Sequence, residues 1–145
     1  MNILIIHGPN LDILGKRDKN LYGELTLKEI NSLIKNKAKE QNLNIDFFQS
    51  NFEGEIIEKI HQAMDGNVDG IIINPAAFTH YSIAIRDAIE AITIPVIEVH
   101  LSNIYSREDF RSKSVIAPVC KGQITGFGYN SYLLALEMLR LMINS

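Results

Sequence analysis

The stretch Pro95-Val-Ile-Glu-Val-His-Leu101 decides the fold, because so apolar and β-branched a run is typical of a strand buried on both faces of a sheet. Four similar runs lie elsewhere in the chain, and they span Asn2 to His7, Leu43 to Gln49, Gly70 to Asn74 and Gln123 to Gly126. Segments with helical spacing separate the runs. This alternation predicts an α/β sandwich, a parallel sheet with helices on both faces.

The first predicted helix, which lies between the first two predicted strands, has the clearest start. Thr26 and Glu29 have the spacing of a capping box, and one apolar stripe continues through Ile30, Leu33, Ile34 and Ala38. A second helix carries Ile56, Ile57, Ile60, Ala63 and Met64 on one face and ends near Gly66. We expect further helices from about Ser82 to Ala91, from Ser106 to Phe110 and from Ser131 to Ile143.

Composition limits the class of protein. With 145 residues, of which 46% are hydrophobic and 21% charged, residues 1–145 are expected to form one domain. The net charge of -3, with scattered lysines and arginines, disfavours nucleic acid and an anionic membrane as partners. No apolar run approaches the roughly 18 residues of a membrane span. Cys120 stands alone, which excludes an internal disulfide and favours a reducing cytoplasm.

Polar residues that could bind a ligand follow the ends of three predicted strands. These segments are Gly8-Pro9-Asn10, Asn74 to His80, and His100 to Asn103. A ligand of an open parallel sheet binds beyond the carboxyl ends of its strands, where the strand order reverses. The amides, imidazoles and hydroxyls found there favour an oxygen-rich small molecule over a metal or a phosphate. P-loop and dinucleotide-binding motifs are absent from the sequence.

Glu98 and His100 are the first candidate pair for catalysis. They lie two residues apart in a strand, so their side chains point to the same side of the sheet. A carboxylate bonded to one imidazole nitrogen fixes the tautomer and favours the protonated ring that a general acid requires. The alternative is a structural hydrogen bond in the core. Position alone supports the two interpretations about equally.

The segment from Lys16 to Gly23 follows the first strand and is expected to form a lid over the site. It holds Tyr22 and Arg17. A phenol is normally a poor base at neutral pH, but a nearby cation favours its ionised form. Arg17 could supply that charge, and Arg107 could reach in from the opposite rim. Alternatively, Tyr22 and both arginines are ordinary solvated surface residues.

Further residues suggest a site for an oxygen-rich acid. Arg107 and Arg111 are four residues apart and would share one face of the predicted short helix. Ser102 and the backbone amides of Leu101 and Ser102 lie where a strand turns, which suits a carboxylate. His80 either joins the site or only caps the following helix.

Three motifs together resemble type II 3-dehydroquinate dehydratase. They are Gly8-Pro-Asn-Leu-Asp-Ile-Leu-Gly-Lys-Arg17 leading to Tyr22-Gly23, Asn74-Pro-Ala-Ala-Phe-Thr-His80, and Glu98-Val-His-Leu-Ser-Asn-Ile-Tyr-Ser-Arg107 followed by Glu-Asp-Phe-Arg111. The likeness continues from Ser114 to Gly128. It implies a flavodoxin-like three-layer sandwich with a five-stranded parallel sheet. It also implies a hydro-lyase without cofactor or metal, which dehydrates 3-dehydroquinate to 3-dehydroshikimate in the shikimate pathway, the route to the aromatic amino acids.

The resemblance also implies residue roles. Tyr22 would act as base with Arg17 and Arg107 beside it, Asn10 would stabilise an enolate, and His100 would act as acid oriented by Glu98. The implied substrate-binding residues are Asn74, His80, Asp87, Leu101, Ser102 and Arg111. Asp87 would serve the site of an adjacent subunit in a dodecamer of four trimers. Among the departures from the family pattern, Ala76 stands where Gly is common and Tyr105 where His is common.

A function from another class remains open. A flavodoxin-like binding or signalling module could use the same polar strand ends merely to hold a small ligand. Turnover of 3-dehydroquinate distinguishes the two hypotheses.

Overall fold

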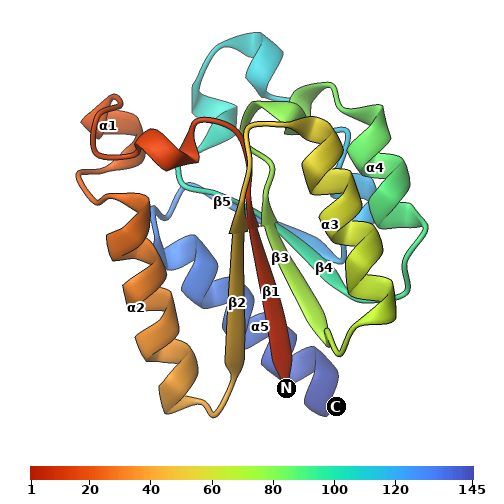
Figure 1. Ribbon diagram of the computed structural model, residues 1–145. Coiled ribbons are helices and arrows are strands. Elements are labelled where there is room, and N and C mark those ends of the chain that lie inside the picture. Colours follow the sequence, from red (N-terminus) through yellow and green to blue (C-terminus); the bar gives the residue numbers. More distant parts are fainter.

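A computed structural model describes all of residues 1–145, and its centre is a five-stranded parallel sheet (Figure 1). The strands are β1 (Asn2–His7), β2 (Asn44–Gln49), β3 (Gly70–Asn74), β4 (Val96–His100) and β5 (Gly122–Thr125). Their order is β2-β1-β3-β4-β5. All five apolar runs of the sequence form strands, with bounds that differ from the predicted ones by no more than two residues. The predicted α/β sandwich is therefore confirmed.

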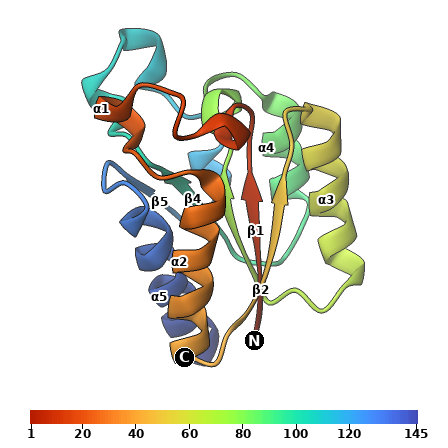
Figure 2. The ribbon, with the colours of Figure 1, turned by 60° about the vertical axis from the view of Figure 1, so that its left-hand side comes forward.

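Helices cover both faces of the sheet (Figures 1 and 2). The helices are α1 (Lys19–Tyr22), α2 (Leu27–Glu40), α3 (Glu53–Asp65), α4 (Ile83–Glu90) and α5 (Asn130–Asn144). One core cluster joins α2 and α5 to the sheet, and a second cluster joins α3 and α4 to its other face. Because both faces of the sheet are covered, β3 and β4 are buried at every residue.

The local signals for helix starts operate as expected in two helices. Thr26 and Glu29 form the predicted capping box of α2. Ser82 caps α4 by accepting a hydrogen bond from the backbone N–H of Ile85. Two apolar residues were wrongly assigned to buried faces, since Leu33 and Met64 are 36% and 50% exposed. Both lie at the border of their helical stripe rather than at its centre.

The predicted helix from Ser106 to Phe110 is wrong. The chain forms two separate 3-10 turns, Ile104–Ser106 and Asp109–Arg111, with extended backbone at Arg107 between them. Asn103 caps the first turn by accepting from the N–H of Tyr105, while the Ser106 hydroxyl donates back to the Asn103 carbonyl. Because Ser106 is used in this way, it starts no helix.

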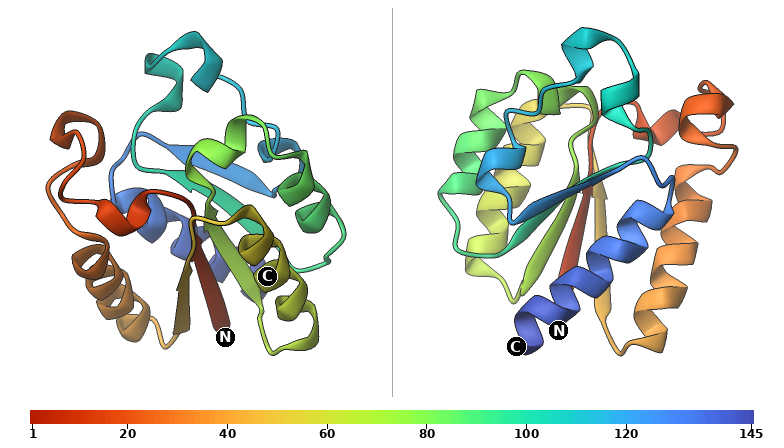
Figure 3. Two further views of the ribbon diagram at one scale, coloured as in Figure 1. Left: turned by 45° about the horizontal axis from the view of Figure 1, so that its top comes forward. Right: turned by 180° about the vertical axis from the view of Figure 1, so that it is seen from behind.

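The ends of β1 and β3 approach each other closely at the point where the strand order reverses. The N–H of Gly8 donates to the Asn74 carbonyl at 2.7 Å. A Cβ at Gly8 would lie 2.7 Å from the backbone of Pro75, so only glycine fits this approach. Segments following β1, β3 and β4 gather at this end of the sheet, as Figure 3 shows from above and behind.

Candidate active site

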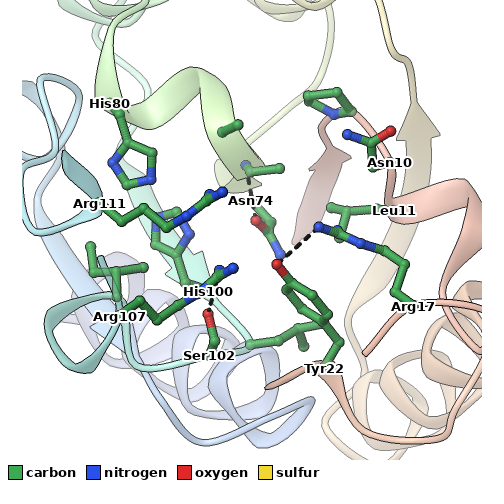
Figure 4. A pocket seen from close by; sticks show the side chains of 15 residues that line it. Asn10, Leu11, Arg17, Tyr22, Asn74, His80, His100, Ser102, Arg107 and Arg111 are labelled. Carbon is green, nitrogen blue, oxygen red and sulfur yellow. Dashed lines mark hydrogen bonds between the residues drawn. The ribbon is translucent and has the colours of Figure 1, made fainter. Parts of the chain in front are cut away.

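A pocket opens at the carboxyl end of the sheet (Figure 4). Its lining includes ten of the twelve site residues proposed from the sequence, namely Asn10, Arg17, Tyr22, Asn74, His80, His100, Leu101, Ser102, Arg107 and Arg111. They come from the ends of three strands and from the segment containing α1. Residues far apart in the sequence therefore converge on one concave site, whose polar lining suits a small oxygen-rich molecule.

His100 and Glu98 form the hydrogen bond that their spacing suggests. Nε2 of His100 lies 2.5 Å from Oε2 of Glu98. Glu98 is fully buried, and His100 is 5% exposed at the pocket wall. The bond to Glu98 occupies Nε2, and Nδ1 of His100 makes no hydrogen bond within the chain. Nδ1 is thus the ring atom left to exchange a proton with a ligand.

Three further side chains hold Glu98 in place, and the sequence did not reveal them. Thr79 donates to Oε2 at 2.5 Å, Gln123 donates to Oε2 at 3.0 Å, and Ser114 donates to Oε1 at 2.8 Å. Burial is the largest influence and alone would raise the pKa of Glu98. The hydrogen bond and charge of His100, with the donors Thr79 and Gln123, nevertheless hold that pKa below its ordinary value. An ionised Glu98 therefore faces Nε2 of His100.

Tyr22 lies on the other side of the pocket from His100, with its hydroxyl directed inward (Figure 4). Nη2 of Arg17 donates to the Tyr22 hydroxyl oxygen at 2.9 Å. The guanidinium carbon of Arg17 lies 3.9 Å from the centre of the Tyr22 ring, and that of Arg107 lies 5.3 Å from it. Two cations therefore flank one phenol, an arrangement that stabilises negative charge on its oxygen.

The rim formed by Ser102 and Arg107 offers unpaired hydrogen-bond donors. Arg107 reaches the Ser102 hydroxyl at 3.4 Å, while its buried Nε has no partner. The backbone N–H groups of Leu101 and Ser102 also make no hydrogen bond within the chain. Buried donors without acceptors are costly, so this arrangement suits an anionic or oxygen-rich ligand.

His80 and Arg111 also line the pocket, on the side of Arg107 and across from Arg17 (Figure 4). Nδ1 of His80 donates to the Lys113 carbonyl at 2.8 Å, so Nε2 of the neutral ring can accept a hydrogen bond from a ligand hydroxyl. The alternative role of His80 as a helix cap is wrong, because Ser82 caps α4. Arg111 pairs with Glu108 at 2.5 Å. Arg107 and Arg111 do not share a helix face, yet both reach the pocket from consecutive turns.

Two asparagines contribute from the ends of β1 and β3. Asn10 has the left-handed backbone angle φ of 68°, and its side chain makes no hydrogen bond within the chain. Asn74 is buried, with its Oδ1 accepting from the N–H of Ala76 at 3.1 Å. Ala76 itself has φ of 50°, which explains why glycine suits this position. Both asparagines thus present amide groups to the pocket.

Asp87, the remaining candidate, and two other ionisable residues lie outside the pocket. Asp87 is exposed on α4 and does not line the pocket of its own chain. His61 is exposed, and Cys120 is half-buried with its pKa raised to about 12 by burial and by the charge of Glu98. The structure contains no group of three or more His, Cys, Asp or Glu side chains placed to hold a metal ion. None of its helices is long and apolar enough to span a membrane.

Comparison with known proteins identifies the family. Residues 1–140 match the family model described as dehydroquinase class II. The chain belongs to the class II dehydroquinase family. This class II dehydroquinase is 61% identical over 138 residues to the 3-dehydroquinate dehydratase of Caldicellulosiruptor saccharolyticus, and the match covers 95% of each protein. It is 57% identical over 136 residues to the enzyme of that name from Campylobacter jejuni, covering 94% of this chain and 85% of the relative.

Solved structures agree with this assignment. The type II dehydroquinase from Butyrivibrio crossotus superposes on this class II dehydroquinase with a TM-score of 0.95 at 49% identity, covering 97% of both chains. The type II dehydroquinase from Propionibacterium acnes gives a TM-score of 0.92 at 38% identity, covering 99% of this chain and 97% of the other. The resemblance noticed in the sequence is therefore confirmed along the whole fold.

Proposed function

We propose that the protein is a 3-dehydroquinate dehydratase, a hydro-lyase that converts 3-dehydroquinate to 3-dehydroshikimate. The observation that carries this proposal is the placement of a phenol flanked by two guanidinium groups opposite an imidazole bonded to a buried carboxylate. Such a pair supplies a base and an acid on different sides of one small ligand. The curated relatives bear the name of this enzyme, which acts in the shikimate pathway.

The reaction begins with proton removal by Tyr22. As a phenolate, Tyr22 takes a proton from the carbon beside the ring ketone, and the electrons of the broken C–H bond form an enolate. Arg17 donates to the phenolate oxygen, and Arg107 adds a second positive charge. The unpaired carboxamide of Asn10 stabilises the enolate oxygen through a bound water.

Water is then eliminated with the help of His100, which lies across the pocket from Tyr22 (Figure 4). The enolate electrons return to re-form the ketone and to make the new C=C bond, while the C–O bond of the tertiary hydroxyl breaks. His100 gives that oxygen a proton, so the leaving group departs as water. Glu98 orients the imidazole and stabilises its protonated form. Afterwards Tyr22 holds the removed proton, and exchange with water restores both groups.

The remaining residues bind the substrate. The side chain of Asn74, the hydroxyl of Ser102 and the free N–H groups of Leu101 and Ser102 hold the carboxylate. His80 and Arg111 bind ring hydroxyls. This division follows from chemistry, because unpaired donors favour an anion, whereas the free Nε2 of His80 accepts from a hydroxyl.

We propose that the protein works as a homo-oligomer, a dodecamer of four trimers in which Asp87 reaches the site of an adjacent subunit. Two observations support this assembly. Asp87 is exposed and does not line the pocket of its own chain, and the nearby residues Tyr81 and Ile83 are 61% and 54% exposed. Apolar side chains at such exposure favour burial against another chain.

We also propose that catalysis needs neither metal nor cofactor, because side chains provide both proton-transfer groups. A strong chelator should leave the rate unchanged, and a lost rate that added metal restores would contradict this. We expect the enzyme to work in the cytoplasm without nucleic acid or membrane as partner.

A spectroscopic assay tests the function directly. The conjugated product absorbs near-ultraviolet light and the substrate does not, so mixing the protein with 3-dehydroquinate should produce a steady rise in absorbance. His100→Ala should retain the fold and lose most of that rate. Substrate that binds without an absorbance rise would favour a flavodoxin-like binding or signalling module instead.

A further inference from the structure

A chain of buried polar side chains lies directly beneath Asn74 and has no part in the mechanism above. Tyr132 of α5 is fully buried, and its hydroxyl lies 3.0 Å from Nδ2 of Asn74 and 2.9 Å from Nδ1 of His7. His7, also fully buried, places its Nε2 2.8 Å from Oδ1 of Asn31 on α2. The chain therefore runs from the pocket to a partly exposed helix.

The hydrogen bonds in this chain can run in only one direction. The backbone N–H of Ala76 can only donate, so the Asn74 atom that it contacts must be Oδ1. Nδ2 of Asn74 then faces Tyr132 and donates to its hydroxyl oxygen. The single hydroxyl proton of Tyr132 must go to Nδ1 of His7, which leaves the His7 proton on Nε2 to be donated to Asn31.

Burial agrees with this direction, because it lowers the pKa of His7 to about 4 and keeps the ring neutral near pH 7. Burial likewise raises the pKa of Tyr132 and keeps its proton in place. Reversing the chain would put the N–H of Ala76 against the NH₂ group of Asn74. That arrangement would set two donors against each other and leave the buried Oδ1 without its backbone partner.

We propose that Tyr132 and His7 are positioning residues that fix the Asn74 carboxamide so that an N–H of Nδ2, rather than Oδ1, faces the ligand. Asn74 lies near the centre of the pocket (Figure 4). With Oδ1 held by Ala76 and one proton of Nδ2 held by Tyr132, the second proton of Nδ2 is left for the ligand. The site thereby selects a hydrogen-bond acceptor such as a carboxylate at this point. This inference rests on the proposed function for the identity of the ligand.

Steady-state kinetics test the positioning role. Tyr132→Phe keeps the ring and removes the hydroxyl, and we expect KM for 3-dehydroquinate to rise about tenfold, the effect of one misplaced hydrogen bond, while kcat stays within about threefold. Tyr129→Phe is the matched control, since the Tyr129 hydroxyl has no hydrogen bond in the structure and should leave both constants unchanged. An unchanged KM in Tyr132→Phe would overturn the proposal.

A double-mutant cycle separates positioning from general damage to the fold. If Tyr132 acts through Asn74, then adding Tyr132→Phe to Asn74→Ala should raise KM no further. A rise as large as the one in the parent protein would show that Tyr132 acts independently of Asn74, and would overturn the proposal.

A third measurement depends on neither activity nor a variant of Tyr132. Nitrogen NMR of the histidine rings at pH 7 should show His7, assigned by the signal lost in His7→Gln, with its proton on Nε2. A proton on Nδ1 would require Tyr132 to donate toward Asn74 and would overturn the proposed direction. If the wild-type protein did not turn over 3-dehydroquinate, only the proposed function would be refuted. The position of the proton on His7 would still decide whether Tyr132 and His7 orient Asn74 as proposed.

Discussion

At the scale of single residues, the acid and the base are supported in different ways. His100 stands on a buried strand beside a carboxylate that receives hydrogen bonds from four side chains. Tyr22 ends a one-turn helix and depends on Arg17 for its only side-chain hydrogen bond. The acid is therefore held by side chains of the core, whereas the hydroxyl of the base is held by a single hydrogen bond from its own segment.

Removal of the Tyr22 hydroxyl tests the assignment of the base. We expect Tyr22→Phe to lower kcat by about two to four orders of magnitude, as is usual when a proton-transfer group is lost, while substrate still binds. Tyr129→Phe again provides the control, because it makes the same chemical change outside the catalytic pocket. Full turnover by Tyr22→Phe would show that another group removes the proton.

The sequence predicted these contacts only in part. Glu98 and His100 could be paired from their two-residue spacing, because alternation along a strand is independent of the rest of the fold. Gln123 becomes visible only when β4 and β5 are aligned, since it is the register partner of Glu98. Tyr132 lies in the helix predicted from Ser131 to Ile143, and no local pattern marks its hydroxyl as the partner of Asn74.

At the scale of elements, apolar periodicity predicted all five strands and the four longer helices. It failed from Ile104 to Arg111, where local hydrogen bonds of Asn103 and Ser106 compete with helix formation. Few apolar contacts anchor such a segment, so periodicity carries little information there. The arginines nevertheless reach the site because each follows or ends a short turn.

The turn after β3 offers a test of backbone strain. Ala76 adopts φ of 50°, a conformation that costs an L-residue about 1–2 kcal/mol, while glycine loses only about 0.5–1 kcal/mol of chain entropy. Ala76→Gly should therefore raise the free energy of unfolding by about 0.5–1 kcal/mol in urea titrations. Ala77→Gly, at the next position without positive φ, should lower it by a similar amount. Equal effects of the two substitutions would contradict this explanation.

At the scale of the whole molecule, the buried His7 makes stability depend on pH. Its pKa falls from 6.5 to about 4 on folding, so below pH 6.5 the unfolded chain binds a proton that the folded chain does not. Stability should thus decline as pH drops from about 6.5 to 4, by roughly 3 kcal/mol in total. Urea titrations across this range should show a smaller decline in His7→Gln. The same decline in both proteins would assign the effect elsewhere.

The proposed assembly has a test that uses two inactive variants. If Asp87 serves a neighbouring site, Asp87→Asn and Tyr22→Phe should each be impaired alone. Mixed oligomers would then contain sites with an intact Tyr22 from one subunit and an intact Asp87 from the next. Random mixing in equal amounts should restore roughly a quarter of the wild-type rate. No recovery after verified subunit exchange would show that Asp87 does not act across a subunit boundary.

The support of Tyr22 by a surface turn, and of His100 by the innermost layer, bears on inhibitor design. A compound extended toward the Tyr22 side displaces only a single turn of helix and its arginine. The same extension toward His100 would press against Glu98 and the sheet beneath it, where interiors pack as tightly as organic crystals. Bulky substituents should therefore gain affinity in the first direction and lose it in the second.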